Sequence, residues 1–510
     1  MTVHILKSYP FPPRKATNPL IPWYACLMFG NSHPQLNRYK TAAAFRSRLK
    51  ELSIELPLDE HILSAAEGSP LAQPIEIFAK TVGNRWCVLP MEGWDGTEDG
   101  KPSVHTLQRW RKFGRSGAKL IYGGEAAAVR HDGRANPHQL LISPENADDL
   151  ADLLGSLRQA HKESFGSDRD LLVGLQLTHS GRFSRPDPGG KPKPRILYHH
   201  PLLDRRVGID PSDDSAVLQD EEIDQIIASF VKAAGLAAEI GFEFVDIKHC
   251  HGYLGHELLS AHTRPGRYGG SLENRTRFLR EIIQGIRRKV PGLPIAVRFS
   301  AFDTVPFHAG EGGVGTPEDF TRCLPYEYGF GVDRDDPLQI DLQEPLALVD
   351  MLDRLEIQLI NISCGSPYYC PHILRPAYYP PSDGYWPPED PLADVARQIH
   401  TARKIRERFP LQVHIGSGYS YLQQFLPLVA QAVVRENWIS CVGIGREVLS
   451  YPELPADTLA GQPLRLKNLC RTFSDCSTGP RNGLISGCYP LDPYYKKLTE
   501  AETVKRLRSY

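Results

Sequence analysis

Short runs of apolar and β-branched residues recur along the chain at intervals long enough to hold a helix. This spacing constrains the fold more than any other feature, because each run has the length of a buried strand. There are eight runs, at residues 85–90, 118–122, 171–176, 244–248, 295–299, 358–362, 412–415 and 440–444. Strands that alternate with helices form parallel sheets, so this pattern predicts an α/β fold, a (β/α)8 TIM barrel.

Several of the intervals carry helix signals. Apolar residues recur with helical spacing over residues 223–234, and Gly241 predicts the end of that helix. Ser271 is expected to cap a second helix, and Ser143-Pro144 predicts the start of a third. The alternative is an open doubly wound sheet. It is disfavoured because no Gly-x-Gly-x-x-Gly turn opens the first strand–helix unit.

The runs divide the chain into three parts. We expect an N-terminal extension at residues 1–72, the barrel at residues 73–455 and a short C-terminal tail at residues 456–510. Within the barrel, three intervals are too long for simple connections, at residues 182–214, 301–341 and 365–391. They follow the third, fifth and sixth strands, so a barrel would place them on its catalytic face.

Charge and cysteine content restrict the partners. The chain has 59 basic and 60 acidic residues and a formal net charge of -1, which favours neither nucleic acid nor a membrane surface. Residues 1–20 contain no signal-like apolar stretch, and the apolar segment 21–30 is too short to span a bilayer. Ten scattered cysteines are typical of reduced thiols in a cytoplasmic protein. We therefore expect a small-molecule substrate and no nucleic-acid or membrane partner. The sequence is compatible with a homo-oligomer.

The fourth run leads into side chains that can handle protons. Residues 244–247 form its apolar part, and Lys248, His249, His251 and Tyr253 follow. Barrel enzymes carry their chemistry at such strand ends. Because strand side chains alternate in direction, His249 is expected to point away from Lys248.

The last two runs end in glycine-rich turns. Residues 416–418 read Gly-Ser-Gly, and residues 443–446 read Gly-Ile-Gly-Arg. The turns after strands seven and eight are the usual phosphate site of such barrels, and Arg446 could supply the cation.

Together with the segment 267–275, these strand ends resemble the old yellow enzyme family of NADH:flavin oxidoreductases, including the barrel domain of its dienoyl-CoA reductase and trimethylamine dehydrogenase branch. The resemblance covers residues 71–453 and is densest at 84–93, 176–182 and 245–280. It implies an FMN cofactor and NADH or NADPH as reductant. The residues that it implies for FMN binding are Pro90, Met91, Glu92, Gly123, Gln176, Arg298, Gly416, Gly418, Gly445 and Arg446.

The resemblance also implies a reaction. Hydride from NAD(P)H would pass through the flavin to an activated alkene: an unsaturated carbonyl compound, an enoate or a thioester. Lys248 and His251 would polarise the carbonyl oxygen, and Tyr253 would donate the proton. The alternatives are a flavin dehydrogenase or demethylase on the same barrel, and a flavin-binding barrel without catalysis.

Two departures from the family pattern lead to further expectations. Lys248 replaces the family's first histidine, and Glu92 stands where relatives often have Thr or Cys, so we expect these two side chains to pair. In the tail, Cys470, Cys476 and Cys488 resemble an iron–sulfur segment, but Phe473 takes the place of its remaining ligand. Four thiolates are the common requirement, so no iron–sulfur cluster and no metal is expected.

Overall fold

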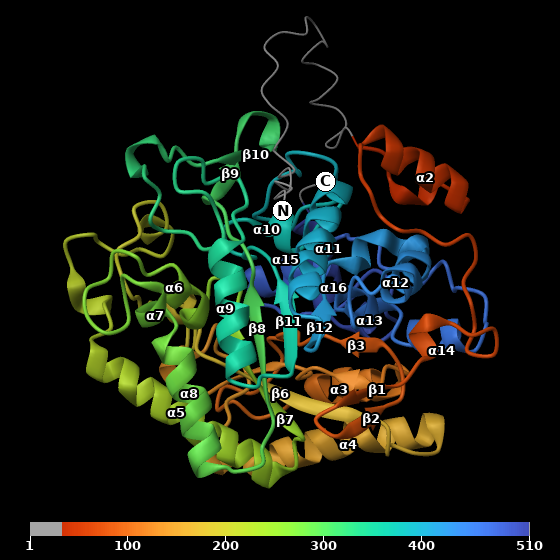
Figure 1. Ribbon diagram of the computed structural model, residues 1–510, viewed down its shortest axis with the longest axis horizontal. Helices are drawn as coiled ribbons and strands as arrows, with labels where there is room; N and C mark the ends of the chain where they lie inside the picture. The colour runs from red at the N-terminus through yellow and green to blue at the C-terminus, as the bar shows by residue number, and fades with distance from the viewer. Residues whose placement is uncertain (1–32, 509–510) are drawn as a thin grey trace, which may run out of the picture.

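Eight parallel strands close into a barrel in the computed structural model, which describes residues 33–508 (Figure 1). The last strand pairs with the first, Val442 beside Trp86, and this contact completes the ring. The predicted (β/α)8 barrel is confirmed, and each predicted run overlaps one barrel strand. The strands are β3 (Trp86–Val88), β4 (Leu120–Ile121), β6 (Leu172–Thr178), β7 (Phe244–His249), β8 (Ile295–Ser300), β11 (Leu359–Ser363), β12 (Val413–Gly416) and β13 (Cys441–Ile444).

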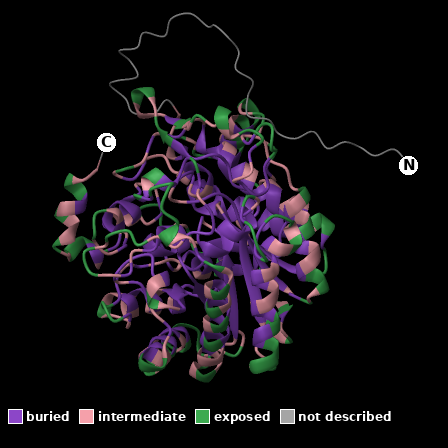
Figure 2. Ribbon diagram, turned by 90° about the vertical axis from the view of Figure 1, so that its left-hand side faces the viewer, coloured by how far each residue is buried: buried purple, intermediate pink, exposed green. Residues whose placement is uncertain are grey.

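Helices surround these strands. Figure 2 shows buried residues along the strands and exposed residues along the outer faces of the helices. The main helices of the barrel are α3 (Val104–Arg115), α4 (Ala147–Phe165), α5 (Asp220–Ile240), α8 (Arg277–Lys289), α9 (Gln343–Arg354), α11 (Pro391–Arg408), α12 (Leu426–Arg435) and α13 (Arg446–Ser450).

The predicted helix boundaries follow local chemistry. Helix α5 ends at Gly241, whose φ of 103° lies in the left-handed region that favours glycine. Ser271 accepts a hydrogen bond from the Asn274 backbone N–H (3.3 Å) and caps α7 (Leu272–Arg275). Pro144 opens a 3-10 turn (Pro144–Asn146) that continues into α4.

A hairpin that the sequence pattern did not predict closes one end of the barrel. Strands β1 (Ile75–Ile77) and β2 (Lys80–Val82) pair antiparallel, and Ile77 and Val82 are buried among the inward-facing side chains of the barrel strands. The Phe78 backbone N–H donates to the side chain of Gln358 (2.9 Å), which directly precedes β11. The hairpin therefore covers the amino ends of the strands, and the carboxyl ends remain for a site.

The three long loops at the carboxyl ends are ordered and share one apolar cluster, which includes Phe183, Phe302 and Tyr369. The third of them contains α10 (Pro371–Leu374). The second contains an antiparallel pair, β9 (Phe307–Ala309) and β10 (Gly315–Pro317). An extra strand, β5 (Ala126–Ala128), pairs with β6, and the short helix α6 (Leu254–Leu259) follows β7.

A segment that precedes the barrel in the sequence and one that follows it both pack against the barrel. Helix α2 (Ala42–Glu51) places Phe45 on Phe425, with ring centroids 4.1 Å apart. In the tail, Asp492 forms an ion pair with Lys112 of α3, and the Tyr494 hydroxyl lies 2.7 Å from His105 Nδ1. The tail helices are α14 (Leu454–Leu459), α15 (Asp475–Arg481) and α16 (Glu500–Arg506).

Two further observations concern the described residues alone. None of the helices within residues 33–508 combines the length and apolar character that crossing a membrane requires. The nine cysteines of this part of the chain are all free thiols. The apolar segment 21–30 lies outside the described residues.

Candidate active site

A cavity of about 440 Å³ opens at the carboxyl ends of the barrel strands. Its volume is that of a typical small-molecule or cofactor site. Lys248, His251 and Tyr253 line it, together with Arg298 of β8 and residues that follow β3, β11, β12 and β13. The cavity therefore gathers the strand ends that the sequence singled out.

The alternation of β7 decides which of its side chains reach the cavity. Lys248 lies beside Arg298 of β8 in the parallel pairing, and both side chains line the cavity. His249 lies beside Phe299, and its ring packs 5.8 Å from the Phe278 ring of α8. His249 thus points away from the site, as its position in the strand predicted.

His251 is held in an uncommon backbone conformation. Its φ of 69° lies in the left-handed region, which costs free energy for a residue with a side chain. Its backbone N–H donates to Ser300 Oγ (3.1 Å), and its Nε2 lies 3.0 Å from Ser363 Oγ. Burial, together with the charges of Arg298 and Lys248, holds the pKa of His251 well below its usual value. The imidazole is therefore neutral, and it can hydrogen-bond an oxygen without adding charge.

Glu92 links the other two predicted catalytic residues. Its Oε1 accepts from Lys248 Nζ (2.8 Å), and its Oε2 accepts from the Tyr253 hydroxyl (2.8 Å). The expected pairing of Glu92 with Lys248 is confirmed. Lys248 Nζ also lies 3.8 Å from the centroid of the Tyr253 ring, a cation–π distance. The ammonium charge is thus compensated before any substrate enters.

The surroundings of the Tyr253 phenol favour its protonated form. Burial raises its pKa well above the usual value, and the negative charge of Glu92 raises it further. A second phenol, Tyr368 from the loop after β11, places its oxygen 2.9 Å from the Tyr253 oxygen. Tyr253 is therefore a protonated donor with two polar neighbours.

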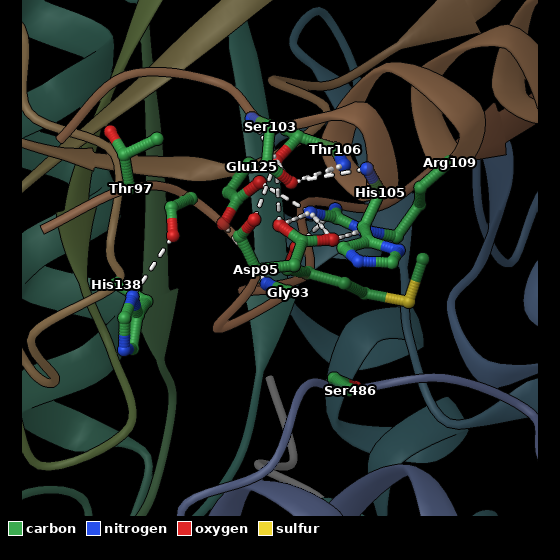
Figure 3. Close-up of polar contacts among 12 residues, drawn as sticks. Gly93, Asp95, Thr97, Ser103, His105, Thr106, Arg109, Glu125, His138 and Ser486 are labelled. Atoms are coloured by element: carbon green, nitrogen blue, oxygen red, sulfur yellow. Dashed lines mark hydrogen bonds and ion pairs between the residues drawn. The ribbon is translucent and has the colours of Figure 1, made fainter. Parts of the chain in front are cut away.

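A buried ionic cluster fixes the backbone on both sides of Glu92 (Figure 3). Arg109 of α3 donates to the Met91 carbonyl (3.1 Å), and Glu125 accepts from the Gly93 backbone N–H (2.9 Å). Arg109 also pairs with Glu125 (2.7 Å) and Asp95 (2.8 Å). A Cβ on Gly93 would lie 1.9 Å from Arg109 Nη2, so this close approach requires glycine. The backbone position of Glu92 is therefore fixed by the contacts of its two neighbours, Met91 and Gly93, independently of its own side chain.

Inside the barrel, Gln176 is oriented by a buried carboxyl group. Its side-chain N–H donates to Asp246 (2.5 Å), which also accepts from the Tyr122 hydroxyl (3.3 Å). Burial raises the pKa of Asp246 to about 7, although the Gln176 hydrogen bond and the charge of Arg298 oppose the rise. The amide oxygen of Gln176 is left available to a ligand donor.

Three arginines bring charge to the cavity that the described residues do not neutralise. Arg298 Nε and Arg375 Nε are buried and have no hydrogen-bond partner within residues 33–508, and the same holds for Arg446 Nη1. Burial lowers the pKa of Arg375 to about 10, and the nearby charge of Arg446 contributes. Arg446 Nη2 donates to the Pro376 carbonyl (2.7 Å). Buried guanidinium nitrogens without a partner are costly, so this end of the cavity is suited to an anion.

Glycine backbone borders the same end. Beside Gly445, a Cβ would meet only Met91 Sδ, at 3.7 Å, so the chain there is open to the cavity. Gly418 has a φ of 93° and also lines the cavity. An available amide oxygen, three guanidinium groups and open glycine backbone in a space of this size fit a flavin mononucleotide with its phosphate near Arg375 and Arg446.

Known proteins are similar to this chain in sequence and in fold. The model of the NADH:flavin oxidoreductase / NADH oxidase family matches residues 70–314. An NADPH dehydrogenase of Halalkalibacterium halodurans is 31% identical over 382 residues, which cover 74% of this chain and 90% of that protein. The chain belongs to the NADH:flavin oxidoreductase family.

Other members align over a smaller part. The NADPH dehydrogenase of Bacillus subtilis is 32% identical over 240 residues, 46% of this chain and 64% of the relative. Among solved structures, a 2-naphthoyl-CoA reductase complex has a TM-score of 0.60 at 17% identity and covers 84% of this chain and 57% of that one. Morphinone reductase with tetrahydroNAD has a TM-score of 0.51 at 20% identity, over 78% of this chain and 92% of that one. These structures share the fold.

The cavity contains most, but not all, of the residues that the family resemblance implied. Eight of the ten residues expected to bind FMN line it; Gly123 and Gly416 do not. A Cβ on Gly123 would lie 2.7 Å from the Gln176 backbone nitrogen, and one on Gly416 would lie 2.8 Å from the Tyr419 hydroxyl. Both glycines therefore allow close packing behind the cavity wall instead of forming its surface.

Several lining residues of this family member were missed by the sequence reasoning. Arg375 and Tyr368 come from the long loop 365–391, whose aromatic content was the only signal. Arg185 comes from the Pro-rich loop after β6. The tail contributes five lining residues, namely Cys476, Ser477, Pro480, Arg481 and Ser486.

The tail cysteines lie close to this wall. Cys476 lines the cavity, and burial raises the pKa of Cys470 to about 12 and that of Cys488 well above its usual value. These two groups are therefore neutral thiols. Within residues 33–508, no group of three or more candidate ligands is arranged to hold a metal ion.

Proposed function

We propose that the protein is an FMN-dependent oxidoreductase that transfers reducing equivalents from NAD(P)H to an activated alkene. The observation that carries the proposal is one cavity in which Lys248, His251 and Tyr253 face the same space as the unpaired arginines. FMN, when bound, supplies hydride acceptance from the nicotinamide and hydride return to the alkene. Relatives named NADPH dehydrogenase support NADPH as the reductant.

The side chains divide the remaining work. His251 and Lys248 bind the carbonyl oxygen of the acceptor, His251 as a neutral hydrogen-bond donor and Lys248 as a charge that it shares with Glu92. Tyr253 gives its hydroxyl proton to the α-carbon of the acceptor. The Tyr368 hydroxyl, 2.9 Å away, is positioned to replace that proton.

A second candidate is the oxidising direction, in which a saturated substrate or an amine is dehydrogenated. The contact of Glu92 with the Tyr253 hydroxyl favours it, because a carboxylate beside a phenol can take up a proton. The pairing of Lys248 with Glu92 also weakens its repulsion of a cationic substrate.

Two half-reactions test the proposal. NADH and NADPH are each added to the flavin-loaded protein without oxygen, and loss of the oxidised-flavin absorbance is recorded. A panel of enones, enoates and unsaturated thioesters is then added to the reduced protein. We expect bleaching by at least one nicotinamide and rapid recovery with at least one alkene. A colourless protein that binds no FMN would exclude both enzymatic candidates, and bleaching by amines or saturated ketones alone would favour the second.

A further inference from the structure

One cationic side chain of the cavity has no partner among residues 33–508 and no place in the reaction described above. Three of the cations that line the cavity are paired: Lys248 with Glu92, Arg481 with Asp383, and Arg206 with Glu318. Arg481 also donates to the Pro367 carbonyl (2.7 Å), and Arg206 to that of Phe307 (2.8 Å).

Within residues 33–508, the cavity cations that form no ion pair fall into two groups, and one of them, Arg446, donates Nη2 to the Pro376 carbonyl (2.7 Å). Arg298, Arg375 and Arg446 are suited to the cofactor, since flavin carries polar groups along its pyrimidine edge and a phosphate on its side chain. Arg185 remains. Its guanidinium makes no hydrogen bond or ion pair with any residue of the described range 33–508, although the residue is only partly exposed.

Arg185 lies on the side of the cavity that holds the proton donor. Two residues before it, Phe183 stacks on Tyr368 with ring centroids 4.0 Å apart, and Tyr368 contacts Tyr253 through its hydroxyl. The Arg185 backbone N–H donates to the Arg134 carbonyl (2.8 Å), which fixes where the side chain starts. The positive charge of Arg185 acts on the Tyr368 phenol, where it opposes the effect of burial on the pKa.

We propose that Arg185 binds a carboxylate carried by the acceptor, so that the preferred substrate is a planar unsaturated carbonyl compound with an anionic group remote from the reacting alkene. This inference rests on the proposed ene-reductase function and deepens it. A guanidinium matches a carboxylate with two parallel hydrogen bonds, and partial burial strengthens such a pair relative to water. Lys248 does not take this role because Glu92 already compensates its charge.

Matched acceptors test the inference. The steady-state KM is measured for an unsaturated oxo acid and for its methyl ester, with the parent protein, Arg185→Gln and Arg185→Lys. We expect Arg185→Gln to raise the KM of the acid roughly tenfold or more and to leave that of the ester unchanged. Arg185→Lys should fall between, because it keeps the charge and loses the paired geometry. Arg205→Gln is the control: it removes the same charge from the same loop, outside the cavity lining.

A second measurement needs no turnover. Benzoate and methyl benzoate are titrated into the oxidised, FMN-loaded protein, and binding is followed by the flavin absorbance. We expect the parent to prefer benzoate and Arg185→Gln to lose that preference. If no alkene reoxidises the reduced protein, the proposed function fails. The titration still tests whether Arg185 binds a carboxylate, because it does not depend on turnover.

Three results would overturn the inference. One is an equal loss for acid and ester, which would make Arg185 a wall of the cavity without charge recognition. Another is no change with either acceptor. The third is slower flavin reduction by NADPH in Arg185→Gln with unchanged acceptor kinetics, which would assign the guanidinium to a phosphate of the dinucleotide.

Discussion

A single carboxylate organises the reactive end of the cavity. Glu92 holds Lys248 with one oxygen and Tyr253 with the other, so the charge of the lysine and the proton of the tyrosine depend on the same side chain. A substrate carbonyl that approaches Lys248 has to compete with Glu92 for the ammonium. In the proposed reaction, binding of the carbonyl oxygen and donation of the proton are therefore coupled through Glu92.

Glu92→Gln should change the redox balance of the bound flavin. The variant removes a negative charge and leaves Lys248 uncompensated, and both effects stabilise the electron-rich reduced cofactor. We expect the midpoint potential to rise by about 30 mV, the equivalent of ~1.4 kcal/mol for two electrons. Asp383→Asn is the control, since it removes an exposed carboxylate that also lines the cavity. An unchanged potential would remove Glu92 from the flavin environment.

Tyr253→Phe should slow one half-reaction alone. Loss of a general acid costs about 10²–10⁴-fold in rate. We expect that loss in the reoxidation of the reduced protein by an alkene, while reduction by NADPH stays near the parent rate. Stopped-flow absorbance separates the two steps. Because burial holds the phenol pKa well above 10, the parent should show no alkaline loss of reoxidation rate from Tyr253 below pH 10.

Equal slowing of both half-reactions in Tyr253→Phe would contradict its role as proton donor. Tyr451→Phe serves as the control, because this buried phenol pairs with Asp457 and does not line the cavity.

At the scale of elements, much of the barrel follows from local pattern. The alternation of β7 predicted which side chains face the cavity, and Gly241 and Ser271 predicted helix ends, because these signals depend on neighbouring residues only. The β1–β2 hairpin was missed for a physical reason. Its turn residues, Phe78 and Ala79, have φ values of 55° and 61°, a conformation that usually calls for Asn or Gly.

For the site as for the barrel, the sequence predicted the residues on strands and missed those on long connections. The family resemblance implied Arg298 and Gln176, and both line the cavity because the barrel places all its strand ends together. Arg375, Arg185 and the tail residues reach the cavity only through the paths of long loops, and neither residue spacing nor composition encodes such paths.

The cluster that ties α3 to the loop after β3 makes stability depend on pH. Burial raises the pKa of Glu125 from 4.5 to about 7, so between these values the folded state binds more protons than the unfolded state. This contribution to the free energy of unfolding is present at acidic pH and is lost as pH rises through 7. Glu125→Gln stays neutral, and its free energy of unfolding should therefore fall less than that of the parent between pH 5 and 8.

Denaturant unfolding at several pH values measures this difference. Parallel curves for the parent and Glu125→Gln would show that Glu125 does not titrate in this range in the folded protein.

At the scale of the whole molecule, the cavity wall is assembled from segments far apart in the sequence. The tail contacts the loop that carries Glu92 through a backbone hydrogen bond, which the Ser486 N–H donates to the Gly93 carbonyl (2.7 Å). The same stretch supplies Arg481 and Cys476 to the cavity. The tail is therefore a structural part of the site.

Ser486→Pro should weaken FMN binding, because proline lacks the N–H that holds the tail on Gly93. We expect a several-fold rise in the dissociation constant, measured by the recovery of flavin fluorescence on dilution. Ser486→Ala is the matched variant, since it keeps the N–H and loses only the hydroxyl contact with the Cys476 carbonyl. Equal affinities for the two variants would argue against the backbone contact.

The tail follows the barrel in the sequence, so it is synthesised after the barrel. A ribosome produces the wall around Pro90 first and the wall around Ser486 roughly 20–80 s later, at typical elongation rates of about 5–20 residues per second. Until then the pocket lacks the part of its wall that the tail supplies. FMN binding that needs the complete pocket is therefore expected only after the tail has been made.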